Sequence, residues 1–103
     1  MIKYFYNEVE DRLDVKLEGD FDIEGTEVVE EELIPTMLNY KTVNIDFENV
    51  PFVDSSGMGL LIDIVKTLND KGIKVTISKV RQEVIEVFEI IQLPEILGEE
   101  VFV

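Results

Sequence analysis

The segment FVDSSGMGLL, residues 52–61, joins an apolar strand to an amphipathic helix. Asp54, Ser55 and Ser56 each offer the short side-chain oxygen that caps a helix N-terminus. The glycines at positions 57 and 59 allow another backbone or a ligand to come close, because they lack a Cβ. The segment therefore predicts a helix N-terminus that a partner can reach.

A strand precedes this segment, and a helix and a second strand follow it. Residues 42–47 alternate apolar and polar side chains, which is typical of a half-buried strand. Apolar residues recur at i, i+3, i+4 and i+7 from Leu61 to Leu68, which predicts a helix over residues 55–70 that ends before Gly72. Residues 73–77 form the next predicted strand. A strand–helix–strand unit requires two parallel strands joined by a right-handed crossover.

Two further strands are predicted near the N-terminus. Residues 2–6 and residues 13–17 alternate in polarity, and the polar residues 7–11 are expected to form the turn between them. This antiparallel hairpin would add an edge to the parallel sheet.

The pattern changes to a helical period after residue 23. Thr26 is the expected N-cap, and Val29, Leu33 and Met37 are expected to face the core. Pro35 lies inside this helix, where a proline removes a hydrogen bond and clashes with the preceding turn at a cost of about 3 kcal/mol. We therefore expect a kink or a break near residues 33 and 34.

The C-terminal quarter predicts a third helix over residues 81–92, which Pro94 ends. Its expected core-facing residues are Val84, Val87, Phe88 and Ile91. A last short strand is expected within residues 95–103. The chain is thus predicted to be a single α/β domain, residues 1–103, with helices packed on a mixed four- to five-stranded sheet in the order β-β-α-β-α-β-α(-β).

The composition limits the function classes. The net charge is −14, from 23 acidic and 9 basic residues, so phosphate backbones and anionic membrane surfaces are disfavoured as partners. The sequence has no cysteine and no histidine, which excludes thiolate nucleophiles, Cys/His zinc sites and the commonest general base. The N-terminus lacks the pattern of a signal peptide, and Asp63 interrupts the longest apolar run. A cytoplasmic protein with no cofactor and no bound metal is expected.

Ser55 has no partner that would make it a catalytic nucleophile. The chain offers no histidine base and no Gly-x-Ser-x-Gly elbow. The sequence therefore predicts a protein that is not an enzyme, in which the serine is presented for modification. A purely structural alternative is that Asp54, Ser55 and Ser56 only cap the helix.

Residues 43–47 followed by residues 52–61 resemble the signature of the anti-sigma-factor antagonist family, the STAS domain. LEGDFD, residues 17–22, resembles the second conserved segment of that family. Residues 71–77 fit its next strand and residues 84–93 its following helix. The resemblance covers most of residues 10–97.

The resemblance implies a bacterial regulator that works as a phosphorylation-controlled binding domain. In that family the unphosphorylated antagonist sequesters an anti-sigma factor, which is an ATP-dependent serine kinase, and so frees the sigma factor. The kinase phosphorylates the serine directly after the aspartate, which is Ser55 here, and the phosphorylated form is released. A metal-dependent phosphatase of the PP2C type restores the serine. The family counterpart of Asp22 lies near the phosphorylation site and the nucleotide of the kinase.

The expected partner-binding surface is the helix start together with the acidic loop beside it. Its residues are Asp20, Asp22, Asp54, Ser55, Ser56, Gly57, Met58 and Gly59. A phosphoserine adds about −1.5 to −2 charge, which a helix N-terminus favours by about 0.3–2 kcal/mol. A carboxylate about 7 Å away opposes each unit of that charge by roughly 0.6 kcal/mol in water and about 2.4 kcal/mol at an effective dielectric constant of 20. We therefore expect phosphorylation to change partner binding without unfolding the domain, which is expected to be a monomer when free.

Two alternatives use the same residues. The first is a constitutive STAS interaction module, stressosome-like or transporter-associated, in which Ser55 is only a cap. The second is a magnesium-dependent phosphotransfer protein, in which Asp20 and Asp22 join Asp46 and Asp54 in a carboxylate cluster. The second alternative is weak, because the chain lacks room for the cap and the extra strands that such phosphohydrolases use.

Overall fold

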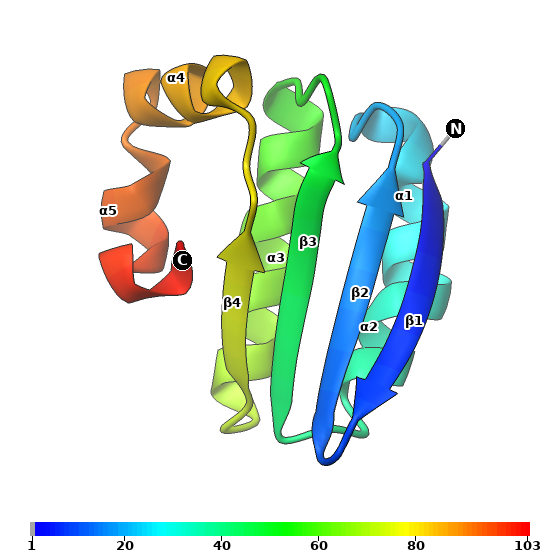
Figure 1. Ribbon diagram of the computed structural model, residues 1–103. Coiled ribbons are helices and arrows are strands. Elements are labelled where there is room, and N and C mark those ends of the chain that lie inside the picture. The colour runs from blue at the N-terminus through cyan, green and yellow to red at the C-terminus, as the bar shows by residue number, and fades with distance from the viewer. Residues whose placement is uncertain (1) are drawn as a thin grey trace.

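The computed structural model describes residues 2–103 and contains one four-stranded sheet. The strands are β1 (Lys3–Val9), β2 (Arg12–Glu18), β3 (Thr42–Asn49) and β4 (Lys74–Ser78), in the spatial order β1-β2-β3-β4 (Figure 1). β1 is antiparallel to β2, whereas β2, β3 and β4 are parallel to their neighbours. The mixed sheet of the predicted α/β fold is confirmed, and its four strands lie within the predicted four to five.

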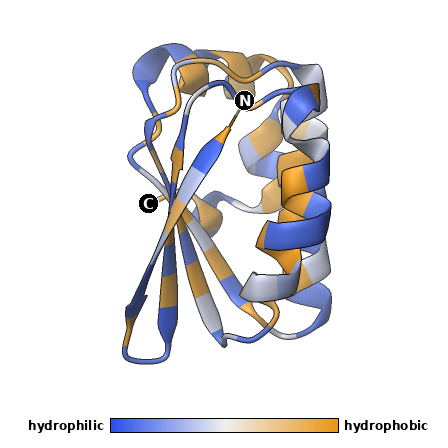
Figure 2. Ribbon diagram, turned by 90° about the vertical axis from the view of Figure 1, so that its right-hand side faces the viewer, coloured by the Kyte–Doolittle hydropathy of each residue, from blue (hydrophilic) through white to orange (hydrophobic). Residues whose placement is uncertain are grey.

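The helices cover one face of the sheet. α1 (Thr26–Val28), α2 (Ile34–Met37) and α3 (Ser55–Asp70) lie behind the strands in Figure 1, while α4 (Gln82–Ile90) and α5 (Leu93–Leu97) lie beside β4. Figure 2 shows the two layers edge-on. In the part of the chain that the structure describes, no helix covers the second face of the sheet (Figure 2).

The core fills the space between these two layers. The alternating residues of the parallel strands point into it, and Leu61, Ile64, Val65 and Leu68 of α3 are buried against them as predicted. Three phenylalanine rings form a row through the core, with ring centroids 5.9 Å apart for Phe21 and Phe47 and 6.4 Å apart for Phe47 and Phe88. Aromatic pairs favour such edge-to-face contacts, so Phe21 ties the loop after β2 to the core.

β1 is longer than predicted. Asn7 pairs with Asp14 and Val9 with Arg12, so only Glu10 and Asp11 form the turn. The expectation of a turn over residues 7–11 was wrong because β1 is an exposed edge strand. Because neither side of this strand is buried, its sequence does not need to alternate between apolar and polar residues.

The first helical segment begins earlier than predicted. Asp22, not Thr26, is the N-cap, and its Oδ1 accepts a hydrogen bond from the backbone N–H of Glu24 at 3.1 Å. A short 3-10 turn, Ile23–Gly25, follows and leads into α1. Thr26 instead donates its hydroxyl to the carbonyl of Ile23 at 2.7 Å.

The helix is irregular just before Pro35, where a kink or a break was predicted, but the backbone stays in the helical region. A π-helical turn, Val29–Leu33, joins α1 to α2, and the N–H of Ile34 reaches back to the carbonyl of Val29. A π turn replaces the usual i→i−4 bonds by i→i−5 bonds, so the backbone stays helical up to a proline that has no N–H to donate. Val29, Leu33 and Met37 all face the core on either side of this turn, and all three are buried as predicted.

The C-terminal residues form a short helix in place of the expected strand. α4 ends at Ile90, before Pro94 as predicted, but Pro94 itself lies in the first turn of the next helix, α5. Gln92, with φ of 58°, lies between the two helices. A 3-10 turn, Glu99–Val101, comes next, and only Phe102 pairs with β4, at Ile77.

The core-facing residues of α4 are confirmed in part. Val84 and Phe88 are buried and Val87 is partly buried, whereas Ile91 is exposed. Ile91 differs from the prediction because α4 already ends at Ile90.

Candidate functional site

Ser55 is the first residue of α3 and is exposed. Asp54 precedes it as the N-cap: its Oδ1 accepts a hydrogen bond from the N–H of Gly57 at 2.8 Å, and its carbonyl accepts one from Met58 at 2.9 Å. This start of α3 lies at the upper end of the molecule in Figure 1, where the parallel strands β2 and β3 end. Open α/β sheets bind their ligands at the carboxyl ends of the strands.

The acidic loop after β2 is fixed beside this helix start. The N–H of Gly19 donates to the carbonyl of Asn49 at 3.0 Å, and the N–H of Phe21 donates to the carbonyl of Phe52 at 2.9 Å. Phe21 also pairs with Val53 as an isolated parallel bridge. The pairing of β2 with β3 thus continues past both strands, and it holds residues 20–22 next to the segment that begins α3.

The two glycines of the segment serve different purposes. A Cβ at Gly57 would lie 1.9 Å from the carbonyl oxygen of Phe21, so only glycine fits there. Gly59 is exposed, and a Cβ at that position would meet nothing within 4 Å. The close approach predicted at Gly57 is therefore filled by the chain's own loop, whereas Gly59 is open to a partner.

Comparison with known proteins places the chain in a family. A sequence model of the STAS domain family matches residues 4–102. The chain belongs to the STAS domain family. An anti-sigma-B factor antagonist of Staphylococcus aureus is 29% identical over 85 residues, which cover 82% of this chain and 79% of the relative.

Solved structures share the fold of this STAS domain at lower identity. SpoIIAA, an anti-sigma factor antagonist, is similar in its unphosphorylated form, with a TM-score of 0.67, 20% identity and coverage of 84% of this chain and 82% of SpoIIAA. The phosphorylated form of Bacillus SpoIIAA has a TM-score of 0.71, 20% identity and coverage of 98% and 89%. The STAS domain of a SulP transporter from Vibrio cholerae has a TM-score of 0.75, 21% identity and coverage of 93% and 75%.

The predicted site residues of this STAS domain separate into exposed and buried groups. Asp20 and Ser55 are exposed, whereas Met58 is only 6% exposed and packs in the core. Ser56 is half-buried and Gly57 is buried. Met58 and Gly57 therefore shape the site from within, and a partner can reach Asp20, Ser55 and Gly59 directly.

Two apolar side chains at the site were not anticipated from the sequence. Ile23 is 65% exposed and Phe52 is 50% exposed, and each lies within two residues of the Phe21–Phe52 hydrogen bond. A large apolar residue inside an otherwise polar loop, as in DIE at residues 22–24, was the signal that could have found Ile23. Exposed apolar groups beside a polar centre are typical of protein–protein contacts.

The carboxylate cluster of the phosphotransfer alternative does not form. Asp46 lies on the uncovered face of the sheet, where it meets the ammonium of Lys79 at 3.8 Å and accepts the N–H of Glu48 at 2.8 Å. Asp22 and Asp54 each bind a backbone N–H of their own helix start. Across residues 2–103, no three acidic side chains are placed to hold a metal ion. Nor is any helix in this range long and apolar enough to cross a bilayer.

Proposed function

We propose that this STAS domain is an anti-sigma factor antagonist, and that phosphorylation of Ser55 switches it off. In its unphosphorylated form it binds and sequesters an anti-sigma factor that is a serine kinase; that kinase phosphorylates Ser55, and a phosphatase of the PP2C type removes the phosphate. The observation that carries the proposal is the exposed hydroxyl of Ser55 at the N-terminus of α3, beside the capping carboxylate of Asp54. The 29% identity to the Staphylococcus aureus antagonist supports it.

The fixed carboxylates explain how one phosphate would change binding. Asp22 and Asp54 each accept a hydrogen bond from a backbone N–H, at 3.1 Å and 2.8 Å. Rotating either carboxylate away from a phosphate on Ser55 would therefore cost its capping bond. A partner that covers the site removes water, which strengthens the repulsion between the phosphate and these carboxylates. Phosphorylation is thus tolerated in the free domain and disfavoured in the complex.

We expect the free domain to keep its fold when Ser55 is phosphorylated. Ser55 is exposed, and the dipole of a 16-residue helix, α3, favours negative charge at this end. SpoIIAA, whose fold this chain shares, has been solved both with and without phosphate.

The remaining contact residues in the proposal are Asp20 and Gly59, with Ile23 and Phe52 as apolar contacts at the edge of the site.

Mass spectrometry tests the modification directly. The protein is recovered from the cells that produce it, in the wild-type form and as Ser55→Ala and Ser56→Ala variants, and its intact mass and phosphopeptides are measured. We expect one phosphate on Ser55 in the wild type and in Ser56→Ala, and none in Ser55→Ala. A phosphate that persists in Ser55→Ala, or its absence from the wild type during growth, starvation and stress, would overturn the assignment.

The constitutive interaction module is the second candidate. The fold similarity to the STAS domain of a Vibrio cholerae transporter shows that this architecture also occurs outside antagonists. The two candidates differ in the binding of Ser55→Asp to the anti-sigma factor kinase encoded in the same genome, measured by calorimetry. The switch predicts a loss of at least about tenfold in affinity, or about 1.4 kcal/mol, whereas a constitutive module binds the variant as tightly as the wild type.

A further inference from the structure

The outer edge of β1 is a second candidate interaction surface. β1 pairs with β2 on one side, and no described residue of the chain pairs with its other side. The strand is seven residues long, and its burial pattern is exposed almost throughout. Such an edge offers a row of backbone N–H and C=O groups to any added strand. In Figure 1, no strand lies beyond β1, and the helical segment that contains α1 and α2 lies behind it.

The two sides of β1 differ in chemistry. On the helix side, Tyr4, Tyr6 and Glu8 lie opposite buried residues of β2. Glu32 of the π-helical turn joins them, because its carboxylate accepts the hydroxyl of Tyr4 and its carbonyl accepts that of Tyr6 at 3.4 Å. This side of the edge therefore presents the carboxylates of Glu8 and Glu32.

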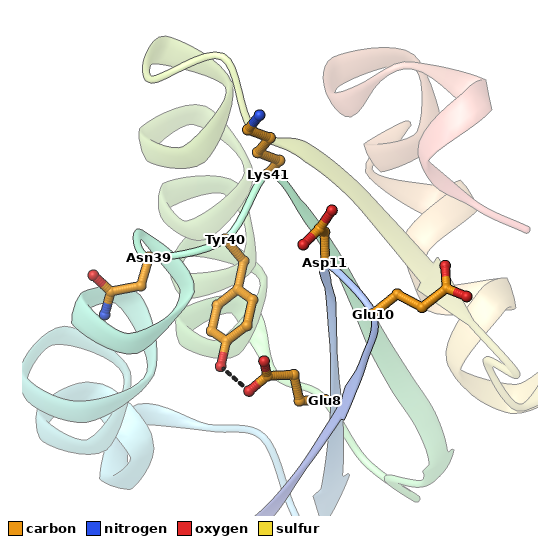
Figure 3. Close-up of a pocket in the computed structure, with 6 residues that line it drawn as sticks. All are labelled: Glu8, Glu10, Asp11, Asn39, Tyr40 and Lys41. Carbon is orange, nitrogen blue, oxygen red and sulfur yellow. Dashed lines mark hydrogen bonds between the residues drawn. The ribbon is translucent and has the colours of Figure 1, made fainter.

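The end of the strand adds further negative charge. Glu8, Glu10, Asp11, Asn39, Tyr40 and Lys41 line a pocket of about 250 Å³ at the β1–β2 turn (Figure 3). Figure 3 shows Glu8 and Tyr40 pointing toward one another, with the Tyr40 hydroxyl donating to Glu8 at 3.0 Å. This hydrogen bond holds the carboxylate of Glu8 close to β1.

The uncovered side of the same strand is partly apolar. Lys3, Phe5, Asn7 and Val9 alternate on it, and Phe5 is 53% exposed. A strand added to β1 would place alternate side chains on these two sides, because successive residues of a strand point to opposite faces. One set would meet Phe5 and Val9, and the other would meet Glu8 and Glu32.

We propose that β1 is a docking edge for an extended segment of a partner protein in which Lys or Arg alternates with apolar residues. The basic residues lie on the helix side and pair with the carboxylates there, and the apolar residues lie on the uncovered face against Phe5 and Val9. A second copy of this chain fits less well, because a two-fold axis through paired β1 edges brings Glu8 and Glu32 of both copies to the same side. Like charges on facing strands are destabilising. The inference does not depend on phosphorylation of Ser55.

A designed peptide tests the edge in the full chain. The probe is a capped seven-residue peptide of alternating lysine and valine, and the control is a peptide of the same composition with its lysines and valines in separate blocks. A second control is the alternating peptide with N-methyl groups on alternate residues, which keeps the charge and removes backbone donors. Binding is followed by amide shifts and by amide hydrogen exchange of the ¹⁵N-labelled protein.

We expect the alternating peptide to shift residues 3–9 and to slow their amide exchange. It should bind about tenfold more tightly than either control, and its affinity should fall as salt is raised. Glu8→Gln and Glu32→Gln should each weaken binding by about threefold, as cross-strand charge pairs do. The matched variant Glu86→Gln, on α4, should leave it unchanged.

Three results would overturn the proposal. Shifts spread over the whole acidic surface would mean that the peptide binds only through general charge attraction. Equal binding of the block or N-methylated peptide would mean that no strand is added. A dimer through β1, seen by sedimentation without any peptide, would make a second copy the occupant.

Discussion

The Cα of Gly57 lies so close to the carbonyl oxygen of Phe21 that a Cβ added at residue 57 would be 1.9 Å from that oxygen. The backbone N–H of Phe21 also donates a hydrogen bond to the carbonyl of Phe52 at 2.9 Å. One close approach therefore holds the acidic loop after β2 against the start of α3. The position of Asp22 relative to Ser55 depends on this contact.

Gly57→Ala is expected to destabilise the domain by about 1–3 kcal/mol, near the upper end because the obstructing atom belongs to the backbone. Gly59→Ala is the matched control two residues away, where a Cβ meets nothing. There alanine should stabilise the free domain by up to about 1 kcal/mol through its higher helix propensity. Urea unfolding of the two variants measures both changes, and equal stabilities would contradict the close approach.

Gly59→Ala also tests the proposed partner contact. If a partner backbone approaches α3 at the open Gly59, the added methyl group should weaken binding of the anti-sigma factor kinase while the free domain becomes more stable. Calorimetric titration against the wild type separates these effects. Unchanged affinity would remove Gly59 from the contact surface.

Asp54→Ala is expected to lower the free energy of unfolding by about 0.5–2 kcal/mol, because the N–H of Gly57 loses its capping partner. Asp54→Asn should cost much less, since asparagine caps a helix about as well as aspartate. The Asn variant removes the charge but keeps the cap. If both variants lost the same stability in thermal unfolding, charge and not capping would be the source of the effect.

Ser55→Asp is expected to change the free energy of unfolding by less than about 1 kcal/mol, because Ser55 is exposed and the helix dipole favours the new charge. Circular dichroism and urea unfolding measure the fold and its stability. Ser55→Asn is the neutral control of similar size. Unfolding of Ser55→Asp alone would show that a negative charge at this position acts on the fold and not on binding.

The Tyr4 hydroxyl should ionise at a higher pH than an ordinary tyrosine. Its hydrogen bond to Glu32 raises the pKa of Tyr4 from 10.0 to about 12, and the bond of Tyr40 to Glu8 also raises the pKa of Tyr40. A raised pKa in the folded state means that the Tyr4–Glu32 bond contributes fully below pH 10 and is lost as the pH rises toward 12. Ultraviolet absorbance of phenolate should therefore show Tyr4 ionising earlier in Glu32→Gln than in the wild type. An unchanged titration curve would exclude this bond in solution.

Much of the fold followed from the sequence because strand and helix periods were clear wherever burial imposes them. α3 was predicted over residues 55–70 and forms over Ser55–Asp70. Predictions failed where burial does not set the pattern, as in residues 7–9 of the exposed β1. Before Pro35 the predicted irregularity is present, but the sequence did not indicate that it takes the form of a π turn over Val29–Leu33.

The candidate site was predicted only in part. The sequence indicated a helix start with Asp54, Ser55 and Ser56 as candidate caps and Ser55 as an accessible serine, because these features are local to one helix start. The structure shows that Asp54 is the cap. It did not indicate that Ile23 and Phe52 are exposed beside them, since exposure depends on how two distant loops meet. The assignment of all these residues to partner binding stays a prediction.

The sequence by itself determined the order of strands and helices as far as α4, the helix start at residues 54–56 and the acidic character of the domain, because each depends on side chains close together in the chain. Only the tertiary structure decided which loop lies against α3, why residue 57 must be glycine, and which strand edge stays unpaired. Those features arise from contacts between residues far apart in sequence, such as Phe21 with Phe52 and Val53. No local pattern encodes such contacts.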